Sequence, residues 1–346
     1  MAKPQMWART RALNVHDDDF PRAQELWARG DARVVGCGPQ AIDVTGLSCG
    51  DAGSWGASDQ AARDAGVMTG VRLRWRQAEG PFRADRCWLL DAGRAWFASP
   101  VPVDGSGGGE VAPVPAAKLA GLRAAEPAPS PGSASTSAAG SASGSAANLT
   151  SLRAAWPLLG DDEAQAAVAA AALAAWHADF GFCPRCGRPT TVQPGGWVRQ
   201  CAVCEAPVFP RIDPAIIVAL IDDRDRLLLG AQQTWGKRRS VFAGFVMAGE
   251  SLEQAVHREI AEEVGLRVDH VRYFGSQPWP FPRSLMVAFT AHVKNPEAMR
   301  VDGEEIVEAD WFTRQEVQKA RSDGEIDLPQ EISVANRLIE TWLQGS

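Results

Sequence analysis

Long apolar segments are missing from this sequence of 346 residues. Its longest apolar run, Ala166 to Trp176, falls well short of the roughly 20 residues that a membrane-spanning helix needs. The first residues, MAKPQMWARTRALNV, lack the apolar core of a secretory signal. We therefore expect a soluble, cytoplasmic protein with no membrane partner.

The sequence also lacks an excess of positive charge. It contains 35 lysines and arginines and 42 acidic residues, which gives a formal net charge of -7. This balance excludes a positive potential over the whole surface that would bind the nucleic-acid backbone. Any nucleic acid must therefore bind to a local group of positive charges. A small anionic substrate needs only a few local cations. The length fits two domains with separate cores, since one domain usually takes roughly 100 to 200 residues.

Cysteine is scarce, and its count of seven is odd. Four cysteines form two CxxC pairs separated by fourteen residues, namely Cys183, Cys186, Cys201 and Cys204. Two such pairs can place four thiolates tetrahedrally around zinc and leave no position for water, which predicts a structural Zn²⁺ site. A redox CxxC pair, or a zinc ribbon that contacts nucleic acid through Arg185, Arg188 and Arg199, is the alternative. We expect Cys37, Cys49 and Cys87 to be ordinary small apolar residues.

Composition and apolar patterning divide the chain into segments. Short alternating apolar runs in Leu26–Thr45 and Arg72–Val101 predict strands, whereas Val103–Ala147 is rich in Gly, Ser, Ala and Pro and predicts a flexible linker. Asp161–Phe180 has the pattern of a helix. We expect an N-terminal strand-rich domain, a linker, a connecting helical segment, a zinc ribbon and a catalytic domain over residues 1–102, 103–147, 148–180, 181–210 and 211–346.

In the last of these segments, apolar strand candidates alternate with helices. The runs AIIVALI, RLLLG and SLMVAFTAHV predict strands, and Glu331–Leu343 predicts a closing helix. This order indicates an α+β protein with a mixed sheet.

A carboxylate-rich segment, Gly244–Leu266, carries the clearest chemical signal. Ser251–Val264 has the apolar spacing of a helix, with Ser at its start and Gly265 as its stop. At about 100° per residue, Glu259, Glu262 and Glu263 share roughly one third of the helix circumference. A solvated acidic face is the simpler interpretation, but it leaves the glycine-bounded loop, Glu250 and Arg258 unexplained.

Hard oxygen ligands of this kind suit Mg²⁺ or Mn²⁺, which bind a few carboxylates together with substrate phosphates. Such an ion neutralises a diphosphate and activates water, while Arg258 can hold a neighbouring carboxylate in register.

The segment resembles the Nudix box, because every position of that motif is matched by Gly244, Glu250, Arg258, Glu259, Ile260, Glu262, Glu263, Gly265 and Leu266. The resemblance implies the α/β/α sandwich of Nudix hydrolases and hydrolysis of a nucleoside diphosphate linked to another group. It also implies Glu250, Arg258, Glu259, Glu262 and Glu263 as catalytic residues. The implied metal ligands are Glu259, Glu262 and Glu263, with the backbone carbonyl of Ala243.

Downstream of the box lies SQPWPFPRS, Ser276–Ser284, in which three prolines stiffen a predicted loop around Trp279 and Phe281. Such a loop can frame a planar ring, although a proline-rich turn that packs two aromatics is the simpler alternative. The segment resembles the motif that distinguishes NADH pyrophosphatases among Nudix proteins. The implied substrate-binding residues are Gln277, Pro278, Trp279, Pro280, Phe281, Pro282, Arg283 and Ser284.

The same resemblance extends to the zinc ribbon and to LLDAGRAWFA (Leu89–Ala98), which is similar to the accessory domain of that subfamily. It implies that Phe245 stacks on nicotinamide, that Glu305 is a further metal ligand, and that Arg153 and Ala335 contact the substrate. Glu304 is the alternative to Glu305. Two further positions depart from the family pattern: Phe209, which we count as substrate-binding, stands where a tyrosine is often found, and Gly196 stands where an acid can occur.

The resemblance implies hydrolysis of NADH or NAD⁺ to AMP and nicotinamide mononucleotide, removal of NAD caps from RNA 5′ ends, and a homodimer. One alternative is another Nudix substrate, such as ADP-ribose or a dinucleoside polyphosphate. An alternative of another class is a zinc-ribbon nucleic-acid-binding protein with an inactive Nudix domain. We assign no general-base role to His257 or His292.

Overall fold

The computed structural model describes residues 33–38, 41–46, 71–73, 76–77, 88–91, 96–100, 149–193 and 195–345. Cys49, Cys87 and the predicted linker Val103–Ala147 lie outside the described residues. The predicted domain boundaries therefore remain predictions.

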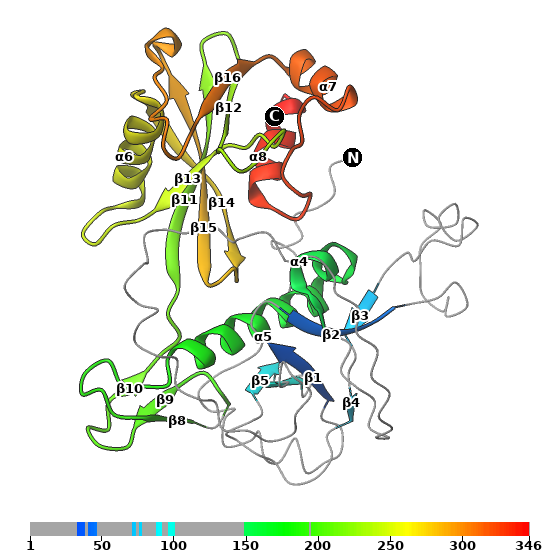
Figure 1. The fold of residues 1–346 in the computed structure, drawn as a ribbon, viewed down its shortest axis with the longest axis vertical. Coiled ribbons are helices and arrows are strands. Elements are labelled where there is room, and N and C mark those ends of the chain that lie inside the picture. The colour runs from blue at the N-terminus through cyan, green and yellow to red at the C-terminus, as the bar shows by residue number, and fades with distance from the viewer. Residues whose placement is uncertain are drawn as a thin grey trace.

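Seven short strands of the described chain form a sheet next to a long helix (Figure 1). These strands are β1 (Arg33–Gly38), β2 (Ala41–Gly46), β3 (Val71–Leu73), β4 (Arg76–Gln77), β5 (Trp88–Asp91), β6 (Trp96–Pro100) and β7 (Leu149–Ser151). The sheet is mixed, since β1 pairs in parallel with β6 and antiparallel with β2 and β4. Strand β7, from the segment predicted to be a connector, pairs with β2 and so joins this N-terminal sheet.

A helical segment follows β7 and covers this sheet. It consists of α4 (Leu152–Ala155), the short 3-10 helix η3 (Trp156–Leu158) and α5 (Asp161–Asp179). The predicted helix Asp161–Phe180 is confirmed, with three acids in the first turn where the helix dipole favours negative charge. The alanines of α5 and Cys37 of β1 share one apolar core. Burial there raises the pKa of the Cys37 thiol, as expected for an ordinary apolar residue.

The segment predicted to be a zinc ribbon forms a small antiparallel sheet at one end of α5 (Figure 1). Its three strands are β8 (Thr190–Val192), β9 (Arg199–Cys201) and β10 (Pro207–Val208). The ribbon leads directly into the first strand of the C-terminal sheet.

A six-stranded mixed sheet forms the C-terminal part, in the order β14-β15-β11-β12-β16 with β13 beside β11. The strands are β11 (Asp213–Asp222), β12 (Leu227–Ala231), β13 (Phe242–Phe245), β14 (Asp269–Trp279), β15 (Ser284–Val293) and β16 (Glu308–Phe312). The helices are α6 (Leu252–Val264), the 3-10 turn η4 (Pro296–Ala298), α7 (Arg314–Ser322) and α8 (Val334–Leu343). One face of the sheet packs against α6, and the other packs against α7 and α8. Because both faces are covered, the central strands read as continuous apolar runs.

The local chemistry of α6 explains where it begins and ends. The Ser251 side chain accepts a hydrogen bond from the Gln254 backbone, and the Gln254 side chain accepts one from the Ser251 backbone. This capping box satisfies amide groups that the helix leaves unpaired at its start. Gly265 ends the helix at a φ of 66°, a left-handed conformation that favours glycine. The predicted helix Ser251–Val264 is confirmed, with Ser251 as its cap.

Two predicted boundaries differ from the structure. Residues Ser276–Trp279 belong to β14 and pair with β15, so only Pro280–Arg283 form the turn that was predicted to be a longer loop. The closing helix begins at Val334, not at Glu331, because the Ser333 side chain caps it. Among the described residues, none of the helices has the length and apolar character that crossing a membrane requires.

Gln277 joins β14 to the start of α8. Its buried amide donates to the Ile332 carbonyl at 2.6 Å and accepts from the Val334 backbone N–H at 2.8 Å. Both groups are shielded from water, so each would lose a partner without Gln277.

We expect Gln277→Met, which keeps the side-chain volume but removes both hydrogen bonds, to lower the free energy of unfolding by about 2 kcal/mol or more. Urea unfolding at pH 7 measures this change. Gln318→Met on the exposed face of α7 is the matched control and is expected to have little effect. Equal stability of the two variants would contradict the structural role of Gln277.

Candidate functional site

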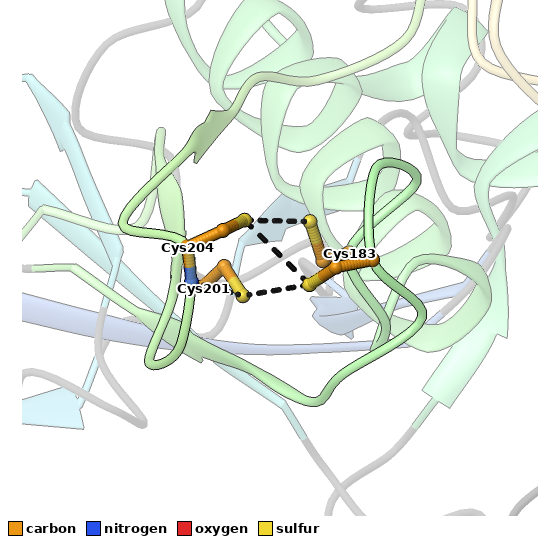
Figure 2. Close-up of side chains that lie close together, drawn as sticks. Cys183, Cys201 and Cys204 are labelled. Carbon is orange, nitrogen blue, oxygen red and sulfur yellow. Dashed lines mark hydrogen bonds between the residues drawn. The ribbon is translucent and has the colours of Figure 1, made fainter.

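The four cysteines of the ribbon lie close together (Figure 2). Their sulfur atoms all lie within 4.8 Å of one another, with Sγ to Sγ distances of 3.4 Å between Cys186 and Cys201 and 3.6 Å between Cys183 and Cys204. A tetrahedral zinc ion with Zn–S bonds of about 2.3 Å requires sulfurs about 3.8 Å apart, so these positions fit zinc with small adjustments. Backbone N–H groups of Cys204 and Val203 lower the pKa of Cys201, which favours the thiolate that zinc binds.

Arg199 joins the ribbon to α5. Its guanidinium donates to the Thr190 hydroxyl at 2.8 Å and contacts Nδ1 of His177 at 3.0 Å, while His177 Nε2 lies 2.9 Å from the Gly196 carbonyl. Burial lowers the pKa of His177 to about 4, which keeps the imidazole neutral at pH 7. Arg199 therefore has a structural role here, whereas Arg185 and Arg188, the other arginines considered for nucleic acid, are exposed.

Arg258 organises the carboxylates of the box. It donates to both oxygens of Glu250, at 2.6 and 2.9 Å, and to Glu259 and Glu262 at 2.8 and 2.9 Å. A further hydrogen bond, at 2.9 Å, reaches the backbone carbonyl of Phe245. The Arg258 guanidinium lowers the pKa of Glu250 to about 2. One cation thus ties the loop before α6 to the acids on the helix.

Gly244 allows Glu259 to lie against the sheet. A Cβ atom at position 244 would lie 1.9 Å from the carboxyl carbon of Glu259, far inside van der Waals contact. The glycine that opens the box is therefore required by the close approach of the Glu259 carboxylate to β13.

Two of the three helix acids are buried. Glu259 and Glu263 are 8% and 4% exposed, whereas Glu262 is exposed. Burial, followed by the negative charges of Glu259, Glu305 and Asp302, raises the pKa of Glu263 to about 8. Burial also raises the pKa of Glu259, although Arg258 opposes the shift.

These acids fit a divalent cation. Glu263 Oε2 is buried and has no hydrogen-bond partner in the part of the chain that the structure describes, which is costly unless a ligand binds there. Its neighbours include Glu305 and Asp302, whose charges act on it. Within the described part of the chain, only the four cysteines bring three or more such ligand atoms within 4.8 Å of one another, so the acids are gathered less tightly than the thiols.

A cavity of about 560 Å³ opens beside Glu263. Several residues predicted to form the site line it, namely Arg153, Ala243, Glu263, Gln277, Trp279 and Ala335. Others were not predicted, because they come from the β12–β13 loop and from the segment before α8: Gln232, Trp235, Arg238, Asp327 and Gln330. The volume is within the range of small-molecule sites, roughly 300 to 1,000 Å³.

Trp279 and Phe281 form an aromatic group with residues that precede α5. Their rings meet edge to face with centroids 5.1 Å apart, and Trp156 lies 5.9 Å from Trp279. The Arg153 guanidinium lies 4.2 Å from the Phe281 ring centroid and 5.3 Å from that of Trp279. Both aromatics pack against the α5 core, and only Trp279 also lines the cavity.

The remaining predicted substrate residues do not line this cavity: Phe209, Phe245, Pro278, Pro280, Phe281, Pro282, Arg283 and Ser284. Phe209 and Phe245 are more than half exposed. Arg283 donates to Asp213 at 3.1 Å and to Asp179 at 2.9 Å, so its charge joins β11 to the end of α5. His292, which was assigned no catalytic role, contacts Asp269 and Asp223 at the far end of β15.

Comparison with known families defines the class of the C-terminal part. Residues 211–329 match the NUDIX domain, so this part of the chain is a Nudix domain. More particularly, residues 178–209 match the NADH pyrophosphatase zinc ribbon domain, which identifies the cysteine site as the zinc site of that ribbon. The resemblance of the box segment to Nudix proteins and that of the cysteine cluster to the zinc ribbon of NADH pyrophosphatases are thereby confirmed.

Several curated proteins are similar to this chain. A Mycobacterium bovis protein named NAD-capped RNA hydrolase NudC is 44% identical over 205 residues, which cover 57% of this chain and 66% of the relative. Human NAD-capped RNA hydrolase NUDT12 is 36% identical over 199 residues, which cover 54% and 43%. The chain thus spans just under two thirds of the mycobacterial relative. A NUDIX hydrolase structure from Nitrosomonas europaea is 21% identical, covers 43% of this chain and 97% of its own, and has a TM-score of 0.33.

We expect Gly244→Ala to weaken Mn²⁺ binding about 10- to 100-fold. The added Cβ displaces the Glu259 carboxylate from Arg258 and from the other two acids on this face of α6. Electron paramagnetic resonance of free Mn²⁺ measures the affinity. Gly275→Ala is the matched control, since a Cβ there meets nothing within 4 Å. Unchanged binding by Gly244→Ala would show that Glu259 is not a ligand.

A second prediction concerns the protein free of divalent ions. Because the pKa of Glu263 is raised, the folded state holds this proton up to about pH 8, whereas the unfolded state releases it near pH 4.5. Stability therefore falls as pH rises between these values, with a slope of at most about 1.4 kcal/mol per pH unit from this group. Glu263→Gln should flatten the slope in urea unfolding measured from pH 5 to 8. Parallel profiles for the two proteins would contradict the burial of a protonated Glu263.

Proposed function

We propose that this protein hydrolyses the diphosphate bond of NADH or NAD⁺ to give AMP and nicotinamide mononucleotide, and that it removes NAD caps from RNA 5′ ends. The observation that carries the proposal is the position of Glu263. This box acid borders a cavity that Trp279 of the SQPWPFPRS segment also lines. The zinc ribbon of the NADH pyrophosphatase type and the names of the curated relatives support the same substrate.

The proposed cation ligands are Glu259, Glu262 and Glu263, with the carbonyl of Ala243 and the carboxylate of Glu305, and the proposed ions are Mg²⁺ or Mn²⁺. Glu305 is favoured over Glu304 because its charge acts on both Glu259 and Glu263. A divalent ion bound there supplies Lewis-acid stabilisation of the diphosphate and of the displaced phosphate oxygen.

The remaining steps belong to side chains. Arg258 fixes Glu259 and Glu262 and offsets their mutual repulsion. Glu263, whose Oε2 has no hydrogen-bond partner among the described residues, is placed to accept a proton from the attacking water once it is ionised. Phe245 presents an exposed ring beside the box for the nicotinamide, and Arg153, Trp279 and Ala335 contact the rest of the dinucleotide from the cavity. Gln277 acts by positioning α8, since its amide is already bonded.

Other features are proposed with the function. The covering of the C-terminal sheet on both faces supports the α/β/α sandwich of Nudix hydrolases, and the N-terminal strands support an accessory domain. We further propose a cytoplasmic location and a homodimer, which the resemblance to NADH pyrophosphatases implies.

A substrate panel tests the proposal. With Mg²⁺ or Mn²⁺ present, we expect kcat/KM for NADH, NAD⁺ and a short NAD-capped RNA to exceed that for ADP-ribose and for dinucleoside polyphosphates. The Glu262→Gln, Glu263→Gln double variant should lose at least about 100-fold in kcat, because it removes two cation ligands.

The matched control is a Glu253→Gln, Glu297→Gln double variant, which removes the same charge from exposed positions. Faster turnover of ADP-ribose than of NADH would favour the alternative Nudix specificity. No turnover of any of these substrates, together with nucleic-acid binding, would favour the zinc-ribbon binding protein.

A further inference from the structure

The segment between η4 and β16 is tied to both neighbouring elements by its backbone. The Asp302 N–H donates to the Glu263 carbonyl in the last turn of α6 at 3.0 Å. The Val307 N–H donates to the Ala231 carbonyl at the end of β12, also at 3.0 Å. Between these bonds, Ile306 is buried in the core that the sheet shares with α6. The segment is therefore held beside the helix that carries the acids of the box.

The Asp302 side chain closes a tight turn within this segment. Its Oδ1 accepts hydrogen bonds from the Glu304 and Ile306 N–H groups at 3.2 and 2.9 Å. Its Oδ2 accepts one from the Glu305 N–H at 3.1 Å. Gly303, at a φ of 76°, has the left-handed conformation that the turn requires. Both carboxylate oxygens of Asp302 thus bind the backbone on either side of the Glu305 side chain.

Glu305 is the acid of this turn whose charge acts on the box. Burial is the main cause that raises the pKa of Glu259 and of Glu263, and the negative charge of Glu305 adds to it in both cases. Such an effect requires the Glu305 carboxylate to lie near both helix acids. Glu263 is itself only 4% exposed, and its Oε2 has no hydrogen-bond partner among the described residues. This orphaned oxygen supports a cation bound between Glu263 and the turn.

We propose that Asp302 is a positioning residue of the cation site, whose carboxylate holds the turn that presents Glu305 to the acids of the box. The inference rests on the proposed function for the role of Glu305 as a cation ligand. Because Asp302 acts through backbone N–H groups, its effect depends on the acceptor atoms that it offers more than on its charge. Groups that orient a metal ligand typically contribute about 10- to 100-fold to metal affinity.

Mn²⁺ binding in the absence of nucleotide tests this role. Electron paramagnetic resonance of free Mn²⁺ would measure the affinity of the zinc-loaded protein and of its variants. Asp302→Ala should weaken binding about tenfold or more, because it removes all three hydrogen bonds of the turn. Asp302→Asn keeps an acceptor for the Glu304 and Ile306 N–H groups and should bind within about threefold of the unsubstituted protein.

Asp310→Ala is the matched control, since it makes the same substitution at an exposed position of β16. It should leave the Mn²⁺ affinity unchanged. Asp302 is likewise exposed, so replacing it opens no cavity in the core.

A double-mutant cycle shows whether Asp302 acts through Glu305. Glu305→Gln alone should weaken Mn²⁺ binding, and Asp302→Ala should add little in that background, because residues that act as a unit are not additive. Additive losses, an equal loss in Asp302→Asn and Asp302→Ala, or unchanged binding in Asp302→Ala would overturn the proposal. Unchanged binding in Glu305→Gln would remove Glu305 from the proposed cation ligands and the inference with it. Since no hydrolysis is measured, each of these results is distinct from a failure of the substrate panel.

Discussion

The catalytic half of this protein depends on the ionic contacts of one side chain, Arg258. Three carboxylates on one face of α6, two of them buried, would repel one another and leave the helix poorly packed against β13. The guanidinium offsets that repulsion and at the same time binds Glu250 on the preceding loop and the Phe245 carbonyl at the end of β13. The loop, the strand and the helix are therefore positioned by one cation. An arginine suits this role because its planar fork serves several oxygens at fixed angles.

Local signals explain why so much of this arrangement could be predicted from the sequence. The spacing of Glu259, Glu262 and Glu263, the cap at Ser251 and the stop at Gly265 all lie within one short segment, so the geometry of a single helix relates them. The four cysteines of the zinc site could be predicted for a similar reason, because the two ligands of each CxxC pair lie close together in the sequence. The central strands were predicted for the same reason: their apolar runs are continuous and contiguous.

The cavity could not be predicted in the same way. Trp235, Arg238 and Asp327 come from loops whose residues follow no periodic pattern, and only tertiary packing brings them opposite Arg153. Asp302 was also missed as an acid near Glu263, because it belongs to a turn after η4 that has no motif of its own. For the SQPWPFPRS segment, the two interpretations considered from the sequence proved compatible. Its aromatics pack into the α5 core as a proline-rich turn would, and one of them, Trp279, still faces the cavity.

Strand β7 has a consequence for how the parts of this protein can be recombined. It ties α4 to the N-terminal sheet, so Arg153 and Trp156 belong by backbone pairing to one part of the molecule and by side-chain contact to another. The Nudix match begins at residue 211, after both of them. A fragment cut at that limit would retain every acid of the box but lose Arg153 from the lining of the cavity. Exchange of whole Nudix domains between homologues would accordingly transfer the acids of the box without transferring the complete cavity.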